Sequence, residues 1–197
     1  MTLPIFPLHA VLFPGGPLTL RIFEPRYLDM VSRVSAGDGR FGVCLIREGQ
    51  ETGAVATPYP VGTRVRIVDS HRRVDGLLGL TVLGEQRFTI LDTTTGADGL
   101  LEAEVELRAN EPPCPLPKDA ADLVEVLRRV LDCAGPLYAA FPTAFDDAVW
   151  VSGRLVELLP LPLTAKQALL EMDGAAARLA RIQDLLERQE RGGVRRH

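Results

Sequence analysis

Residues 3–27, LPIFPLHAVLFPGGPLTLRIFEPRY, contain the pattern that decides the fold. The runs LPIFP and LTLRI are rich in apolar and β-branched residues and are bordered by proline or glycine, which is typical of first or edge strands. Between them, Pro14, Gly15 and Gly16 allow a sharp turn with positive φ. The stretch predicts two strands joined by a loop that displays Phe13.

The sequence period changes directly after the second run. Pro25 suits the first turn of a helix, and Tyr27, Leu28 and Val31 recur at the spacing of one helix face before Gly37. We therefore predict a short amphipathic helix over residues 24–35.

Further strand patterns follow at regular intervals. They are FGVCLI (41–46), VGTRVRIVD (61–69), LLGLTVLG (77–84), RFTILD (87–92) and EAEVELR (102–108). Asp75-Gly76 and Asp98-Gly99 are turn signals that fit hairpins. Six or seven short strands and one inserted helix predict a small β pseudo-barrel over residues 1–110.

The stretch NEPPCPLPK (110–118) has four prolines in nine residues, which favours a stiff extended connector over residues 111–118. After it, apolar residues recur at helical spacing, and four helices are expected to form a bundle over residues 119–190. The basic RGGVRRH segment (191–197) is expected to be a flexible tail. The predicted fold class is therefore α+β, a barrel followed by a four-helix bundle.

Composition and charge narrow the class of protein. The chain has 46% hydrophobic and 24% charged residues and a net charge of −4, which is ordinary for a globular protein. No basic-headed signal peptide and no apolar run of about 18 residues is present, so we expect a cytoplasmic protein without a membrane partner. Residues 21–73 carry nine arginines against six acidic residues. The acidic total nevertheless argues against nucleic acid as a partner.

The sequence offers no clear catalytic or metal-binding pattern. Cys44, Cys114 and Cys133 are widely spaced, so we expect buried free thiols and predict no metal site. Neither lysine follows the glycine spacing of a phosphate-binding loop, which predicts no ATP or other cofactor.

The sequence contains two candidate catalytic arrangements. Ser152 and Lys166 form the only arguable nucleophile and base, but they lie on different predicted helices. His71 could act as a base with Asp69 or Asp75, but a histidine at a hairpin end is more often a solvated residue. We predict that the chain is not an enzyme.

Several stretches taken together carry a family resemblance. LPIFPLHAVLFPGGPLTLRIFEPRYLDMV, VGTRVRIV, GEQRFTI and LLPLPLTAKQALLEMDGAAARLARI resemble the N-terminal substrate-binding domain of Lon proteases, above all stand-alone bacterial proteins made of that domain. The resemblance covers residues 1 to about 187. It implies a PUA-like pseudo-barrel, a helical bundle and recognition of polypeptides, with ATP hydrolysis and proteolysis assigned to domains of other family members.

The resemblance implies unfolded or partly folded polypeptides as partners, together with a protease or chaperone, and a role as an adaptor or chaperone-like protein. Binding is expected to involve an apolar groove formed by Phe13, Phe23 and Tyr27 near Arg21 and Arg26. The alternative is that the two aromatic residues of the helix start belong to the core, with the arginines paired to Glu24 and Asp29. RNA is the alternative ligand, because PUA-like barrels also bind RNA.

Overall fold

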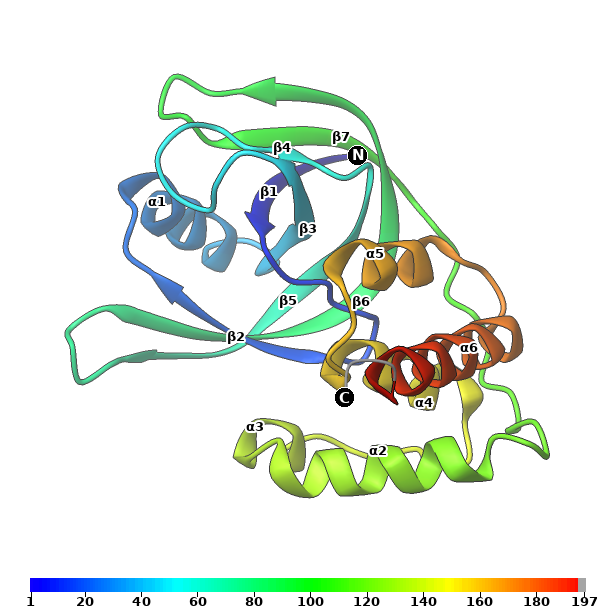
Figure 1. Ribbon diagram of the computed structural model, residues 1–197. Helices are drawn as coiled ribbons and strands as arrows, with labels where there is room; N and C mark the ends of the chain where they lie inside the picture. The colour runs from blue at the N-terminus through cyan, green and yellow to red at the C-terminus, as the bar shows by residue number, and fades with distance from the viewer. Residues whose placement is uncertain (195–197) are drawn as a thin grey trace. The chain divides into compact units, whose positions relative to one another are not determined.

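The structure, a computed structural model, describes residues 1–194, with side chains described as far as Gln189. It divides into two compact units, Met1–Asn110 and a second unit that begins at Glu111 (Figure 1). The first unit is built around a β-sheet and the second consists of helices.

The first unit is a seven-stranded barrel with one inserted helix, and all of its residues are described. In chain order its elements are β1 (Thr2–Leu8), β2 (Pro17–Ile22), α1 (Pro25–Ser35), β3 (Arg40–Glu48), β4 (Thr57–Pro58), β5 (Val61–Arg72), β6 (Leu78–Thr95) and β7 (Leu101–Leu107). The strand order is β1-β7-β6-β5-β3-β4, and a parallel pairing of β1 with β3 closes the ring. The predicted α+β pseudo-barrel is confirmed.

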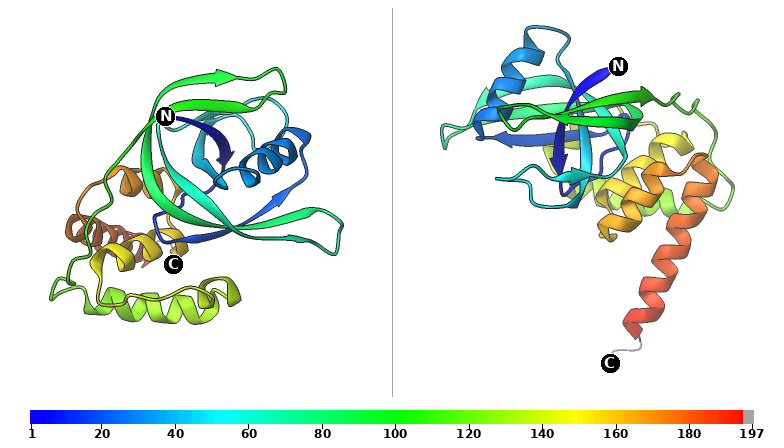
Figure 2. Two further views of the ribbon diagram at one scale, coloured as in Figure 1. Left: turned by 180° about the vertical axis from the view of Figure 1, so that it is seen from behind. Right: turned by 90° about the horizontal axis from the view of Figure 1, so that it is seen from above.

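The strand β6 differs from the prediction, because one continuous strand replaces two separate ones. It pairs with β5 along one edge, and along the other edge first with β2 and then with β7. Register shifts between Arg64 and Val65 and between Ile67 and Asp69 mark bulges in its pairing with β5. Bulges bend a strand without ending it, so the long strand can follow the curve of the barrel. The β5–β6 hairpin extends beyond the barrel in both Figure 1 and Figure 2.

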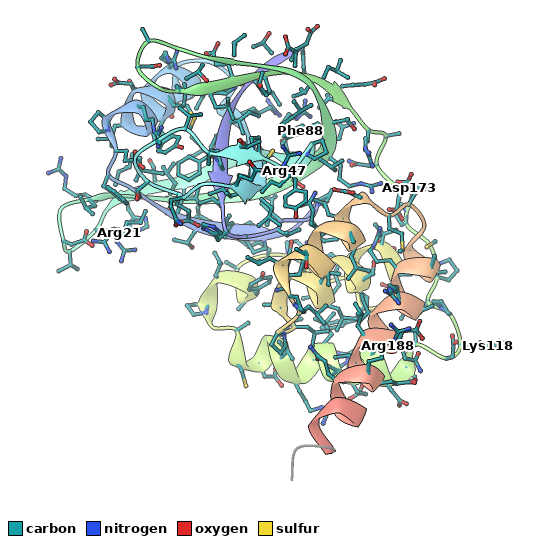
Figure 3. The ribbon with its side chains drawn as sticks, turned by 45° about the horizontal axis from the view of Figure 1, so that its top comes forward. Arg21, Arg47, Phe88, Lys118, Asp173 and Arg188 are labelled. Carbon is teal, nitrogen blue, oxygen red and sulfur yellow. The ribbon has the colours of Figure 1, made fainter. Side chains whose placement is uncertain are left out.

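Two apolar clusters fill the barrel unit. The larger one joins α1 to the sheet through Tyr27, Met30 and Val31, which pack with residues of β1, β2, β3, β5 and β6. The smaller cluster is built around Phe88 and Ile5. In Figure 3 the labelled Phe88 lies inside the barrel unit. Along β7, buried residues alternate with more exposed ones, as in a strand with one face toward the core.

Between Glu111 and Val194 the chain forms five helices, one more than expected. They are α2 (Ala121–Cys133), α3 (Pro136–Ala139), α4 (Ala148–Leu158), α5 (Leu163–Glu171) and α6 (Ala175–Val194). The additional helix, α3, is a single turn that begins after Gly135. The helix α4 is the most buried and packs against α2, α5 and α6. Of the expected flexible tail, residues 191–194 continue α6, and residues 195–197 lie outside the described residues.

The proline-rich stretch is joined to the helical unit by specific contacts. The Cys114 N–H donates to Oδ1 of Asp147, and the Ala148 N–H donates to the Cys114 carbonyl. Pro115 forms an isolated bridge with Asp147. The stretch is therefore anchored to the start of α4.

The three cysteines are free thiols, but their burial differs from the expectation. Cys44 is buried, Cys114 is half-buried and Cys133 is exposed at the end of α2. Burial raises the pKa of the Cys44 thiol far above its usual range. The prediction of burial is wrong for Cys133, which is the last residue of α2 and lies beyond the buried residues of that helix, Leu123, Val124 and Leu127.

No helix within residues 1–194 combines the length and the apolar character that crossing a membrane requires.

Candidate functional site

The barrel unit contains a pocket of about 310 Å³ beside β2. It is lined by residues of β1, β2, the start of α1 and the loop after β3, namely Phe6, Leu8, Thr19, Leu20, Arg21, Ile22, Phe23, Glu24, Tyr27, Glu51 and Thr52. The volume is at the small end of the range of about 300–1,000 Å³ that is typical of ligand pockets. The pocket is suited to one or two apolar side chains.

The base of the pocket is aromatic and packs into the core. The ring centroids of Phe6 and Tyr27 are 4.2 Å apart, and Phe6 is also 6.2 Å from Phe41. The sequence produces this contact because Phe6 points inward from β1, while Tyr27 lies in the first turn of α1. The pocket therefore has a preformed apolar floor.

Phe23 projects from the short turn between β2 and α1. Phe23 is 50% exposed. The residue before it, Ile22, faces the core and is only 1% exposed. Exposing this much of an aromatic ring to water costs hydrophobic free energy. Phe23 is therefore the lining residue with the most apolar surface left to cover.

Charged residues surround the apolar floor. Arg21 is 57% exposed and pairs with Asp75 of the β5–β6 turn, with an N–O distance of 3.4 Å. Figure 3 shows Arg21 on the side of the unit where this hairpin extends. Glu24 pairs with Arg26 at 2.9 Å. The rim thus carries both signs of charge.

The pocket keeps Tyr27 in its neutral form. Burial raises the pKa of Tyr27, the Arg26 guanidinium opposes this effect, and the carboxylates of Glu24 and Glu51 add to it. The phenol is therefore a neutral hydrogen-bonding group near physiological pH. The Arg26 guanidinium also lies 4.7 Å from the centre of the Tyr27 ring.

The loop after β3 closes one side of the pocket. Its Glu51 accepts a hydrogen bond of 2.6 Å from the His9 N–H, at the end of β1. The Nδ1 atom of His9 lies 3.4 Å from the same carboxylate oxygen. This contact holds the loop, including Thr52, against the first strand.

The structure brings three of the five predicted binding residues to one pocket. Arg21, Phe23 and Tyr27 line it. Arg26 is buried instead, where it pairs with Glu24 and donates to the Gly99 carbonyl at 3.2 Å. The alternative that places both aromatic residues in the core is confirmed for Tyr27, which is only 6% exposed, and is wrong for Phe23, which is 50% exposed.

The expectation that the Pro-Gly loop displays Phe13 is wrong, because Phe13 is 3% exposed. The loop is fixed to β6 by the Gly15 N–H donating to the Gly84 carbonyl and the Gly84 N–H donating to the Gly16 carbonyl. A Cβ atom on Gly84 would overlap the Phe13 carbonyl oxygen, so the approach is close. These backbone contacts hold the loop inward.

Sequence reasoning missed the other half of the pocket. Phe6 and Leu8 share one face of β1 by strand alternation, and this pattern could have paired them with Leu20 and Ile22 of β2. Glu51 and Thr52 lie in a loop without any periodic pattern. Only the tertiary structure places that loop beside the first strand.

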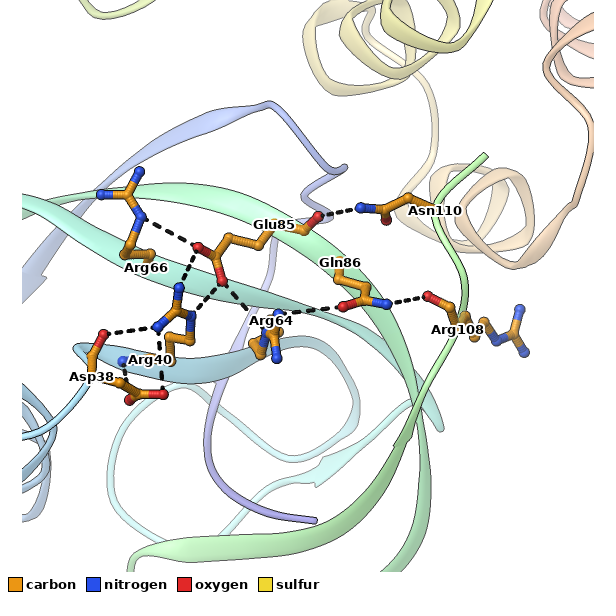
Figure 4. Close-up of polar contacts among 8 residues, drawn as sticks. All are labelled: Asp38, Arg40, Arg64, Arg66, Glu85, Gln86, Arg108 and Asn110. Carbon is orange, nitrogen blue, oxygen red and sulfur yellow. Dashed lines mark hydrogen bonds and ion pairs between the residues drawn. The ribbon is translucent and has the colours of Figure 1, made fainter. Parts of the chain in front are cut away.

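A basic cluster lies elsewhere on the barrel. Figure 4 shows the guanidinium groups of Arg40, Arg64 and Arg66 converging on Glu85, with Nε–Oε distances of 2.7, 3.5 and 3.2 Å. Burial alone would raise the pKa of Glu85, but the hydrogen bond from Arg40 and the three positive charges hold that pKa below its ordinary value. The cluster is thus a shared ion-pair network.

The other arginines of residues 21–73 are also mostly paired. Eight of the nine in this fully described stretch form ion pairs with carboxylates. Phosphate groups would have to compete with these internal partners. The local excess of arginine is therefore a weak argument for RNA.

The pairing of Ser152 with Lys166 finds no matching geometry in the described residues, whereas His71 does lie beside one of its two candidate partners. Ser152 is buried; its Oγ donates to the Val149 carbonyl and accepts from Nε of Arg178. Lys166 donates to the Glu157 carbonyl at 2.8 Å. His71 is exposed on β5, with Nδ1 3.4 Å from Asp69. Serine and lysine are thus held by different partners.

A second pocket, of about 390 Å³, lies in the helical unit around the end of α2. Its Phe145 ring has the Arg128 guanidinium 3.9 Å above its centre. Burial raises the pKa of Tyr138 in its wall, and the Glu157 carboxylate, whose Oε2 lies 3.3 Å from the phenol oxygen, adds to this effect. In this pocket a guanidinium group of the protein itself therefore already covers one face of the Phe145 ring.

Comparisons with known proteins agree with the observed fold. The family model of the ATP-dependent protease La (LON) substrate-binding domain matches residues 2–188. The chain is 28% identical over 195 residues to Lon protease 2 of Myxococcus xanthus, which covers 95% of this chain and 24% of that protein. The chain therefore spans about a quarter of the length of this relative.

Two solved structures have the same fold. The Lon N-terminal domain protein from Xanthomonas campestris is 36% identical, with a TM-score of 0.77 and coverage of 93% of this chain and 98% of that chain. The N-terminal domain of the Mycobacterium avium complex Lon protease is 16% identical, with a TM-score of 0.65 and coverage of 93% and 97%. The family match covers residues 2–188, which include every residue of the barrel pocket, and this chain therefore belongs to the LON substrate-binding domain family.

Proposed function

We propose that the chain is a non-catalytic module that binds unfolded or partly folded polypeptides at the barrel pocket, as an adaptor or chaperone-like protein in protein quality control. Membership of a substrate-binding family supports binding of polypeptides. The observation that carries the proposal is the half-exposed Phe23 beside a preformed aromatic floor.

The chemistry of the pocket fits segments that folding normally hides. Unfolded chains expose apolar side chains, and covering Phe23 together with such a side chain would remove apolar surface from water on both partners. The rim carries Arg21 as well as Glu24 and Glu51, so neither sign of charge dominates. Selection would therefore depend on apolar character more than on charge.

Binding can be measured by fluorescence anisotropy with fluorescein-labelled, reduced and carboxymethylated α-lactalbumin as a permanently unfolded probe. Phe23→Ala should weaken binding by about 1–2 kcal/mol, because it removes the exposed aromatic surface. Leu91→Ala is the matched control, because Leu91 is also an exposed apolar residue of the barrel but does not line this pocket.

Native, disulfide-bonded α-lactalbumin provides the second control and should not bind. Failure of the wild-type chain to bind the unfolded probe at tens of micromolar would refute the proposal. Equal losses in Phe23→Ala and Leu91→Ala would show that the pocket is not the site. A salt-dependent shift with structured RNA at physiological salt would favour the alternative ligand.

A further inference from the structure

We infer that the bound polypeptide adds as an extended strand to the open edge of β2 and places one apolar side chain in the barrel pocket. This inference rests on the proposed function and specifies how the polypeptide is recognised. It follows from the strand pairing, the direction of the backbone groups on β2, and the position of the pocket along that strand.

One edge of β2 has no partner strand. All six residues of β2 pair with β6, from Pro17 opposite Leu83 to Ile22 opposite Leu78. Within the described residues, no other strand pairs with β2. An unpaired edge presents a row of backbone donors and acceptors to which an extended chain can bind.

The register shows which backbone groups lie on that open edge. In antiparallel pairs, alternate residues direct their N–H and C=O groups toward the partner strand. The Gly84 N–H donates to the Gly16 carbonyl at 2.9 Å, so residue 16 and, by alternation, Leu18 and Leu20 face β6. Thr19 and Arg21 therefore direct their N–H and C=O groups to the open edge.

The position of Pro17 agrees with this assignment. Pro17 lies two residues before Thr19 on β2, so its backbone nitrogen faces the same edge, and this nitrogen carries no N–H group. Within a sheet, proline is tolerated where its missing N–H would point away from the partner strand. The sequence thus already contains a proline whose nitrogen faces the open edge.

The pocket lies along this edge rather than over one face of the strand. Its lining includes every residue from Thr19 to Glu24, both inward-facing and outward-facing ones. Phe6 and Leu8 line the pocket from β1. They follow Ile5, the last residue of β1 that pairs with β7. The barrel is therefore open between β2 and the end of β1.

An extended segment is the ligand that satisfies both features together. Its backbone can pair with Thr19 and Arg21, and every second side chain would point toward the apolar floor formed by Phe6 and Tyr27. A helix could fill the pocket but could not use the edge groups, because its own backbone groups are already paired. We therefore expect a preference for segments with β-branched and aromatic residues.

The test compares Thr19→Pro with Thr19→Ala in the full chain. Thr19 is exposed, and its N–H takes no part in the β2–β6 ladder, so both variants should fold. Only the proline variant loses the N–H on the open edge. With a fluorescein-labelled peptide that alternates threonine and valine around one phenylalanine, Thr19→Pro should bind about fivefold to tenfold more weakly than Thr19→Ala.

The outcomes separate this inference from the proposed function. If the wild-type chain binds both the peptide and unfolded α-lactalbumin, and Thr19→Pro binds them as tightly as Thr19→Ala does, strand addition is refuted and polypeptide binding stands. If the wild-type chain binds neither probe, the proposed function itself fails. A selective loss in Thr19→Pro supports both.

A second measurement keeps the inference testable if circular dichroism shows that Thr19→Pro does not fold. Two versions of the peptide carry backbone N-methyl groups on alternate residues, one on the odd positions and one on the even positions. Pairing with a single strand edge requires that the wild-type chain bind one version at least fivefold more tightly than the other, since N-methylation on one parity removes the pairing donors. Equal affinities would overturn strand addition.

Discussion

At the residue scale, Glu85 is the carboxylate that forms ion pairs with three arginines. Arg40, Arg64 and Arg66 come from β3 and β5, and Glu85 comes from β6, so one side chain links three strands. The Glu85 side chain is 18% exposed, which limits its screening by water. Removing its charge would leave three guanidinium groups close together.

We predict that Glu85→Gln lowers the free energy of unfolding by about 1–2 kcal/mol at pH 7. Because the pKa of Glu85 is lower in the folded state than in the unfolded state, the carboxylate stabilises the fold above the unfolded value of about 4.3. This contribution disappears as pH falls through the folded pKa. Urea unfolding of both proteins at pH 7 and pH 3 should show the difference shrinking at acid pH.

Glu104→Gln is the matched control, because Glu104 is exposed on β7 and its substitution should change stability little at either pH. A difference between wild type and Glu85→Gln that stays constant from pH 7 to pH 3 would contradict the role assigned to the charge.

At the element scale, the start of α4 anchors the proline-rich stretch. Oδ1 of Asp147 accepts from the Val149 N–H at 3.0 Å, as an N-cap does, and from the Cys114 N–H at 3.1 Å. The same carboxylate thus caps the N-terminus of α4 and binds a segment about thirty residues earlier in the chain. Helix capping and chain connection depend on one side chain.

Asp147→Ala should therefore destabilise the helical unit by about 1–2 kcal/mol, because two backbone N–H groups lose their acceptor. Urea unfolding followed by circular dichroism at 222 nm would measure the change. The neighbouring Asp146 is exposed, so Asp146→Ala serves as the control and should be close to neutral. Similar losses in both variants would indicate a general charge effect at the helix N-terminus in place of the specific cap.

At the scale of the whole molecule, the barrel unit contains the parts that its own fold requires. Both of its apolar clusters consist of residues before Asn110, and the β1–β3 pairing that closes the ring lies within it. The helical unit has buried polar contacts of its own, including Arg154 with Glu157 at 2.7 Å and Arg178 with Glu111 at 2.8 Å.

We predict that the fragment of residues 1–110 folds without the rest of the chain. It should show a β-rich circular dichroism spectrum and a cooperative urea transition, because its hydrophobic clusters and its closed ring are complete. The fragment of residues 10–110 is the control, since removing β1 opens the ring and deletes Ile5 and Phe6 from the clusters. A broad, non-cooperative transition of the 1–110 fragment would contradict the prediction.

The sequence by itself predicted most of the elements and their order, but not the short strand β4, the continuity of β6 or the one-turn helix α3. Prolines and glycines mark the borders of strands, and α1 begins at Pro25, as predicted. The Asp75-Gly76 and Asp98-Gly99 pairs lie at two hairpin turns. These features depend on φ preferences and on side-chain alternation, which act over a few residues. Local physics is therefore sufficient to predict an α+β chain with a barrel of six or seven strands.

Only the tertiary structure decided which side chains meet. Phe13 is buried because backbone groups of β6, some seventy residues later, hold its loop inward. Glu51 reaches the pocket because His9 holds its loop beside β1, and Glu85 lowers the cost of three neighbouring arginines because the strands align them. Exposure and pairing depend on contacts between distant segments, whose register no local pattern specifies. That is why the grouping of Arg21, Phe23 and Tyr27 in one place could be predicted from their closeness in the sequence. The contribution of Phe6 and Leu8 to the same pocket, and the open edge of β2, could not.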